Sequence, residues 1–332
     1  MRNIALLPKE EREILFINTS RKMHITEAIV EKDFWVCFTL DYLFHESKWR
    51  DCLAFKGGTS LSKAYNLIER FSEDIDLILD WRVLGYKKNE PLEIPSNTKR
   101  EHFIKDSKER LFYFLANDFT PIFCMDMNRI LNEPVKIYVD PNDSGIVNFE
   151  YPSSFTDESI LRIIRLEIGA LAAWTPVNEI NISPYINDYY PEVLEKGSTS
   201  ILTTTAERTF WEKATILHQE AYRPDNSNIP VRYSRHYYDL YCMFKKGVLE
   251  RAKDDGQLLE KVAEFKRLFY PRGWAHYELA RIGTIKLFPA EHSISELRKD
   301  YEKMSKMIYG DYPSFDELLE QIVKIEHIIN NS

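Results

Sequence analysis

The stretch that most constrains this chain joins a glycine pair, Gly57-Gly58, to two aspartates that alternate with apolar residues, Asp74 and Asp76. Side chains in a strand alternate between its faces, so both carboxylates should leave the same face. Two adjacent carboxylates repel each other unless a cation lies between them, and their oxygens suit Mg²⁺. The glycines would let a phosphate approach the backbone closely where the next helix begins.

Around this stretch the sequence predicts a strand before the glycine pair, a short helix over residues 61–69 and a tight turn at 70–73. The strand that carries the aspartates follows. Ser72 lies two residues before Asp74 and would share its face if the strand already begins there. Ser72 would then touch phosphate or be a site of regulatory modification, and the alternative is a serine that only caps the turn.

Composition limits the class of protein without deciding its function. The 332 residues are 44% hydrophobic and 29% charged, which is typical of a folded chain with one large or two medium domains. The net charge of −8 excludes a uniformly basic nucleic-acid coat but allows a local basic patch. We expect reduced thiols and a cytoplasmic location, because no signal peptide, apolar run of about 18 residues or metal-binding cysteine spacing is present. The cysteines are Cys37, Cys52, Cys124 and Cys242.

Periodicity predicts an α+β half followed by a helical half, with domains at 1–200 and 201–332. Helices are expected in 8–46, the second over about 26–44, and over 101–119, with a loop at 82–100. Strands are expected at 135–139, 145–151 and 160–168, the first two as a hairpin, and a turn-rich linker at 185–205. The charged run Glu31-Lys32-Asp33 fits a solvated stripe, or else a role in positioning the glycine loop.

In the second half, Lys213 falls on the apolar face of a helix that begins near Thr205. A lysine on a core-facing stripe is unfavourable unless an anion meets it. A nucleotide triphosphate would do so, and so would Glu207 or Glu212. In the next helix Asp239 follows Arg235 by four residues, which fits either a surface ion pair or a functional carboxylate. His236, between them, is interpreted as a packed histidine.

Several blocks together resemble the AbiEii/AbiGii toxin family of nucleotidyltransferases. They are Lys-Gly-Gly-Thr-Ser-Leu-Ser-Lys-Ala-Tyr from residue 56, Arg-Phe-Ser-Glu-Asp-Ile-Asp-Leu from 70, Leu-Glu-Ile-Gly-Ala from 166, Glu-Arg-Thr-Phe-Trp-Glu-Lys-Ala from 207 and Arg-His-Tyr-Tyr-Asp-Leu from 235. The resemblance implies a nucleotidyltransferase (polymerase-beta-like) fold, in which a mixed sheet with helices is followed by a helical C-terminal domain. That second domain would contribute to the active-site cleft.

The resemblance also implies roles for individual residues. Asp74 and Asp76 would hold Mg²⁺ or Mn²⁺. Glu167 would complete the metal site or act as the base. The alternative for Glu167 is a structural glutamate at the end of a strand, paired with Arg165 or Arg162. Lys213 would hold phosphates and Asp239 would orient it. The nucleoside triphosphate would lie on Gly57, Gly58, Thr59, Ser60 and Ser72, together with Lys213. Further candidates for substrate binding are Lys63, Arg235, Arg272 and Lys286.

The implied activity is transfer of a nucleoside monophosphate to the 3′ end of tRNA, which blocks translation. Such toxins belong to type IV toxin–antitoxin and phage-defence (abortive-infection) systems, with a separately encoded antitoxin of transcriptional-regulator type. One alternative is a protein or small-molecule acceptor such as an aminoglycoside, and another is a catalytically inactive nucleotide- or RNA-binding module. The loops at 272–277 and 283–287 mix basic and aromatic residues, which suits single-stranded nucleic acid as well as an ordinary turn.

Overall fold

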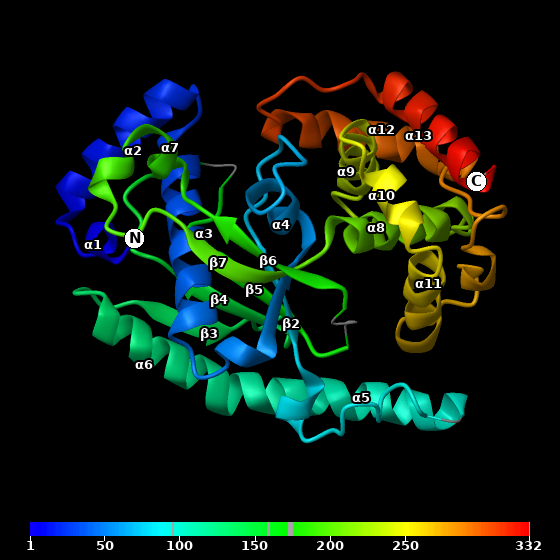
Figure 1. The fold of residues 1–332 in the computed structure, drawn as a ribbon, viewed down its shortest axis with the longest axis horizontal. Helices are drawn as coiled ribbons and strands as arrows, with labels where there is room; N and C mark the ends of the chain where they lie inside the picture. The colour runs from blue at the N-terminus through cyan, green and yellow to red at the C-terminus, as the bar shows by residue number, and fades with distance from the viewer. Residues whose placement is uncertain (95, 158–159, 172–174, 332) are drawn as a thin grey trace. The chain divides into compact units, whose positions relative to one another are not determined.

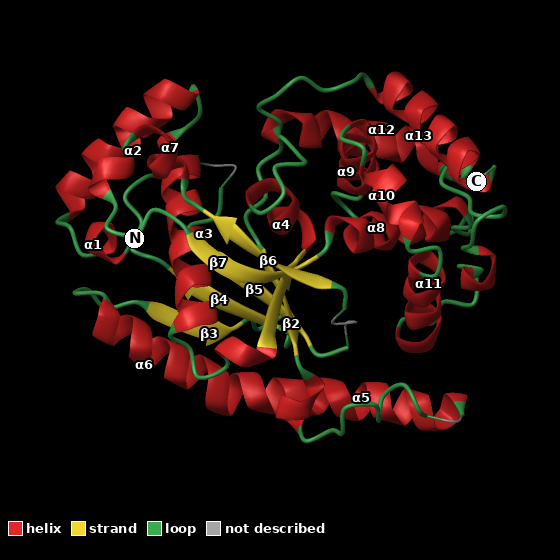
Figure 2. Ribbon diagram, viewed as in Figure 1, coloured by secondary structure: helices red, strands yellow, loops and turns green. Residues whose placement is uncertain are grey.

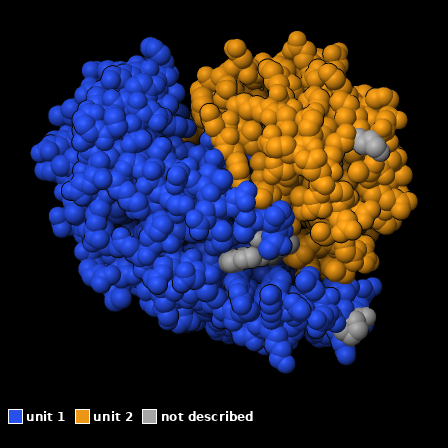
Figure 3. Space-filling view, in the orientation of Figure 1, with its two compact units in different colours: residues 1–64, 72–203 blue, residues 65–71, 204–332 orange. Residues whose placement is uncertain are grey.

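The computed structural model describes residues 1–94, 96–157, 160–171 and 175–331. The chain folds into two compact units (Figure 3). The sheet unit comprises Met1–Ala64 and Ser72–Thr203, and the helical unit comprises Tyr65–Phe71 and Thr204–Ser332. The short segment Tyr65–Phe71 therefore belongs by its contacts to the helical unit, although the chain on both sides of it belongs to the sheet unit.

A seven-stranded mixed sheet forms the centre of the sheet unit (Figure 2), in the order β3-β4-β5-β2-β1-β7-β6. β2 pairs antiparallel with β1 and parallel with β5, so the strand of the two aspartates lies inside the sheet. This mixed sheet with many helices confirms the predicted fold class. The strands are β1 Leu53–Lys56, β2 Ile75–Leu79, β3 Lys136–Val139, β4 Ile146–Glu150, β5 Ile164–Gly169, β6 Val177–Ile182 and β7 Thr199–Thr204.

Helix α3 crosses the sheet in Figure 1 and is buried on all sides along most of its length. Its Phe34 and Trp35 are fully buried and pack edge to face. A π-helical turn, Leu115–Phe119, joins α5 to α6 in one long helical stretch. The helices of the sheet unit are α1 Arg2–Ala5, α2 Lys9–Met23, α3 Glu27–His45, α4 Gly57–Lys63, α5 Asn97–Phe114, α6 Thr120–Ile130 and α7 Tyr185–Tyr189, with 3-10 turns Arg50–Cys52, Trp81–Leu84 and Pro191–Val193.

The helical unit is built around α8, which packs against α9, α10 and α11. The side chain of Thr205 caps α8 by accepting the N–H of Arg208, as the sequence predicts. Its helices are α8 Ala206–Ala221, α9 Ser234–Lys245, α10 Val248–Asp254, α11 Leu258–Phe269, α12 Ile294–Met304 and α13 Phe315–Asn330, with 3-10 turns Tyr277–Leu279, Glu291–Ser293 and Ser305–Met307. None of the helices in the described ranges has the length and apolarity that a membrane span requires.

Three local expectations are wrong. The helix expected over 61–69 is α4, which includes the glycines and ends at Lys63, and Asn66 just beyond it has a left-handed φ of 49°. The linker expected over 185–205 contains α7 and β7, whose Thr203 pairs with Phe55 of β1. The helix expected to end near 119 continues to Ile130. β7 is defined by its pairing with β1 rather than by the local sequence pattern, and the π-helical turn carries the helix past residue 119.

Candidate active site

Asp76 lies in the middle of a row of charged residues that crosses three strands. Its partner on β1 is Lys56 and its partner on β5 is Glu167. Residues paired across neighbouring strands present their side chains on the same face, with Cβ atoms roughly 5 Å apart. Asp74 precedes β2, and the alternation of burial places it on the same side as Asp76, while Ile75 is buried. Sheet register thus brings Asp76 and Glu167 together from sequence positions far apart.

Gly57 fixes the approach of the glycine loop to this row. Its φ is +81°, and a Cβ added there would lie 1.9 Å from Oδ2 of Asp76. Any other residue would therefore be strained and would collide with the carboxylate. The requirement for glycine comes from the close contact between the start of α4 and Asp76.

The hydroxyls predicted to touch phosphate are engaged within the loop itself. The Thr59 hydroxyl donates to the backbone oxygen of Asp74 at 2.5 Å and lies 3.0 Å from Oγ of Ser72. The Ser60 hydroxyl donates to the backbone oxygen of Gly57 at 2.8 Å. Thr59 and Ser60 are buried and Ser72 is half-buried. These contacts tie α4 to the segment that carries Asp74.

The charged run on α3 is buried, so its interpretation as a solvated stripe is wrong. Lys32 pairs with Glu73 at 2.7 Å, and Asp33 pairs with Lys63 at 2.6 Å. Lys63, a predicted substrate contact, also lies 3.9 Å above the ring of Tyr185. Glu167, by contrast, is partly exposed, and its Oε1 lies 4.0 Å from Nη2 of Arg165.

In the helical unit, Asp239 is fully buried and accepts hydrogen bonds from two cations. Arg70 donates to it from Nε and Nη2, both at 2.7 Å, and Nζ of Lys213 lies 2.8 Å from Oδ2. A surface ion pair between Arg235 and Asp239 is therefore excluded. Of the carboxylates suggested for Lys213, Glu207 pairs with Arg251 and Glu212 with Arg208.

Arg70 is the residue of this cluster that the sequence does not reveal. It stands 169 positions from Asp239, in the segment Tyr65–Phe71. Two backbone hydrogen bonds hold this segment in the helical unit. The N–H of Phe71 donates to the backbone oxygen of Met307, and the N–H of Tyr309 donates to the backbone oxygen of Glu69. No local periodicity marks an arginine in a turn as the partner of so distant a carboxylate.

The cluster carries more positive than negative charge. Burial alone would raise the pKa of Asp239, but Arg70 and Lys213 outweigh it and hold that pKa well below its usual range. Burial and the nearby Arg70 lower the pKa of Lys213. Burial and the charges of Lys213 and Arg235 also lower the pKa of His236, whose Nδ1 is buried without a hydrogen-bond partner among the described residues. An excess of cations around one carboxylate suits an anionic ligand.

The model of the family described as nucleotidyltransferase AbiEii toxins of type IV toxin–antitoxin systems matches residues 41–321. The chain belongs to this AbiEii family. It is thus a transferase of the nucleotidyltransferase type and the toxin member of a toxin–antitoxin pair. Among solved structures it is similar to MenT4, a nucleotidyltransferase toxin from Mycobacterium tuberculosis H37Rv, with 13% identity, 95% of this chain and 98% of that chain covered, and a TM-score of 0.47. No curated protein sequence gave a match.

Two loops of this AbiEii toxin, 272–277 and 283–287, meet at His218. Its Nε2 lies 3.0 Å from the backbone oxygen of His276, and its Nδ1 accepts the backbone N–H of Lys286 at 3.0 Å. Cations lie over the neighbouring rings: Lys286 Nζ is 4.8 Å from the Tyr222 ring and Arg272 Cζ is 5.8 Å from the Trp274 ring. We call Tyr222, Arg272, Trp274, His276 and Lys286 the basic-aromatic surface.

The side chains at this site that could bind a divalent cation are the carboxylates of Asp74, Asp76 and Glu167. Within the described ranges, no three His, Cys, Asp or Glu side chains converge on one point that could hold a metal ion. Mg²⁺ is normally held by one or two carboxylates together with substrate phosphates, so a complete protein cage is not required. The paired positions of Asp76 and Glu167, with Asp74 two residues before Asp76, fit that mode of binding.

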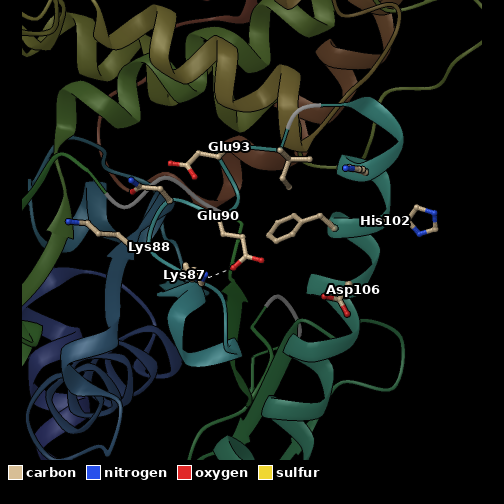
Figure 4. A pocket seen from close by; sticks show the side chains of 10 residues that line it. Lys87, Lys88, Glu90, Glu93, His102 and Asp106 are labelled. Atoms are coloured by element: carbon tan, nitrogen blue, oxygen red, sulfur yellow. Dashed lines mark hydrogen bonds between the residues drawn. The ribbon is translucent and has the colours of Figure 1, made fainter.

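A separate hollow in the sheet unit lies between residues 87–94 and the first turns of α5 (Figure 4). Lysines and a histidine line it together with carboxylates, among them Lys87, Glu90 and His102. None of the predicted site residues lines it, so the hollow is not part of the candidate active site.

Proposed function

We propose that this AbiEii toxin transfers a nucleoside monophosphate from a nucleoside triphosphate to the 3′-terminal hydroxyl of tRNA, with Mg²⁺ as the cofactor. The observation that carries the proposal is the row of Asp76 and Glu167 against the backbone of Gly57. Blocked translation would follow in the cytoplasm. A separately encoded antitoxin of transcriptional-regulator type would control the toxin.

In this proposal Asp74 and Asp76 hold the cation, which would supply Lewis-acid stabilisation of the attacking and leaving oxygens. The acceptor oxygen forms a bond to the α-phosphorus, the bond from that phosphorus to the bridging oxygen breaks, and pyrophosphate leaves. Glu167, partly exposed and beside Asp76, accepts the proton of the acceptor hydroxyl. Thr59 keeps the Asp74 backbone in place.

Lys213 offsets the negative charge that develops on the leaving phosphates, and Asp239 orients its amine. The charge of the cluster supports this role, since Arg70 and Lys213 share one carboxylate. Because two cations face a single carboxylate, the cluster still attracts an anion while Lys213 contacts Asp239. The basic-aromatic surface supports an RNA acceptor, because exposed cations beside Trp274 and Tyr222 offer both charge and stacking to unpaired bases.

The test is incubation of the purified toxin with each labelled nucleoside triphosphate, total tRNA and Mg²⁺. We expect label on the tRNA 3′ end, none with Asp76→Ala, and loss of toxicity of that variant in cells. Sequencing of tRNA 3′ ends after expression gives an independent readout. Label on protein or on a small molecule would move the acceptor, and no transfer together with full toxicity of Asp76→Ala would refute the enzymatic proposal.

A further inference from the structure

Three consecutive charged residues of α3 are buried and point toward different parts of the sheet unit. Glu31, Lys32 and Asp33 are 4% exposed or less. Successive residues of a helix are turned by about 100°, so three in a row cover somewhat more than half of its circumference. A stretch of charge at the centre of a unit is unfavourable unless its groups have partners, and here Lys32 and Asp33 each have a partner of opposite charge while Glu31 accepts two backbone N–H groups.

Lys32 connects two segments that lead into candidate catalytic strands. Its Nζ donates to Oε2 of Glu73 and to the backbone oxygen of Leu161, both at 2.7 Å. Glu73 is the residue immediately before Asp74, and Leu161 lies just upstream of β5, which carries Glu167. A single ammonium group therefore fixes the entry to both carboxylate-bearing strands.

Asp33 holds the other side of the glycine loop. Its Oδ1 lies 2.6 Å from Nζ of Lys63, at the end of α4, and its Oδ2 accepts the backbone N–H of Tyr185 at 2.7 Å. Glu31 accepts the backbone N–H groups of Ser154 and Phe155 at 2.7 and 3.1 Å. The same turn of α3 thus reaches the segments before Asp74, before Glu167 and after Gly57.

We propose that Lys32 and Asp33 are positioning residues for nucleotidyl transfer, with the Lys32–Glu73 pair setting the place of Asp74. Replacement of a buried ion pair by apolar residues is often neutral for stability, so stability alone does not explain a buried charged run. What the pairs supply is fixed geometry, and a displacement of about 1 Å in a reacting group lowers rates by roughly 100-fold. The inference rests on the proposed function, because its test uses that reaction.

The test is the double variant Lys32→Met/Glu73→Met, which removes both charges together. The control is Tyr42→Phe, which removes a 2.7 Å hydrogen bond from the same helix to Asp126 of α6. We measure kcat, KM for the nucleotide and the melting temperature. The expected result is a kcat lowered by about 10- to 100-fold at a melting temperature close to that of the control, whose kcat is unchanged.

A kcat within twofold of the wild-type value in the folded double variant would overturn the inference, since a merely structural pair affects only the melting temperature. If the double variant does not fold, Glu73→Gln, which keeps the shape and one acceptor, replaces it. A kcat within twofold of the wild-type value in that variant would overturn the inference in the same way. Failure of the wild-type protein to transfer any nucleotide counts against the proposed function instead, so the two failures are distinguishable.

Discussion

The balance of charge around Asp239 gives a prediction in which two substitutions that both abolish activity differ in stability. In the wild-type protein two cations, Arg70 and Lys213, share one buried carboxylate. Asp239→Asn leaves both cations without an anion. Lys213→Met leaves Arg70 and Asp239 as a balanced, bidentate pair with both contacts at 2.7 Å.

The expected magnitudes follow from these contacts. Removal of one partner from a buried ion pair destabilises by about 3 to 5 kcal/mol, and Asp239→Asn should reach that range because it weakens three charge-assisted hydrogen bonds at once. Lys213→Met removes a buried cation whose pKa is already lowered by burial, and it should change the free energy of unfolding by no more than about 1 kcal/mol.

The assay is urea unfolding at pH 7, followed by tryptophan fluorescence, with nucleotidyl transfer measured on the same preparations. Trp211 reports on the helical unit, because it is buried in α8 and its Nε1 donates to the backbone oxygen of Ala252. Both variants should lose transfer. Equal destabilisation of the two variants, or an Asp239→Asn protein within about 1 kcal/mol of wild type, would refute the charge-balance reasoning.

Three further predictions concern other parts of the toxin. Gly57→Ala should lower kcat by at least about 100-fold because the added Cβ displaces the Asp76 carboxylate, whereas Gly256→Ala, which has open space, should leave kcat unchanged. Burial raises the pKa of Glu31 to about 7. The folded protein then binds more protons than the unfolded chain between pH 4.5 and 7, so this group lowers stability by up to about 3 kcal/mol as pH rises through that window. Melting temperatures from pH 5 to 8 should show a flatter pH dependence in Glu31→Gln, and an identical dependence would contradict the assignment. Trp274→Ala should raise KM for tRNA by about 10-fold and leave KM for the nucleotide unchanged, and steady-state kinetics in each substrate checks this.

Elements with strong local signals could be predicted from the sequence. Helix α3 begins after Thr26 as expected, α8 is capped by Thr205, and the hairpin of β3 and β4 has Val139 opposite Val147. Each depends on periodicity, capping or turn chemistry within a few residues. The sequence does not reveal β7, because the turn-forming residues Pro191 and Gly197 before it favour a linker, and the strand is defined by its place beside β1.

Long-range pairs could not be read from local pattern. The pairing of Asp76 with Glu167 across neighbouring strands depends on the register of β2 and β5, and the ion pair of Arg70 with Asp239 depends on the path of a turn. The burial of Glu31-Lys32-Asp33 did have a signal. The residues after them, from Phe34 to Phe38, are apolar on every side of the helix, which is typical of a helix surrounded by protein. Charges on such a helix must find partners.

The path of segment Tyr65–Phe71 also limits how this protein can be divided. The chain passes from one unit to the other after Ala64, after Phe71 and after Thr203. A fragment beginning at Thr204 would lack Arg70 and leave Asp239 with Lys213 alone, and a fragment ending at Thr203 would carry a segment without its backbone partners Met307 and Tyr309. Recombination between related genes at a single junction would separate these partners. A functional hybrid must therefore take residues 65–71 from the same parent as its helical half.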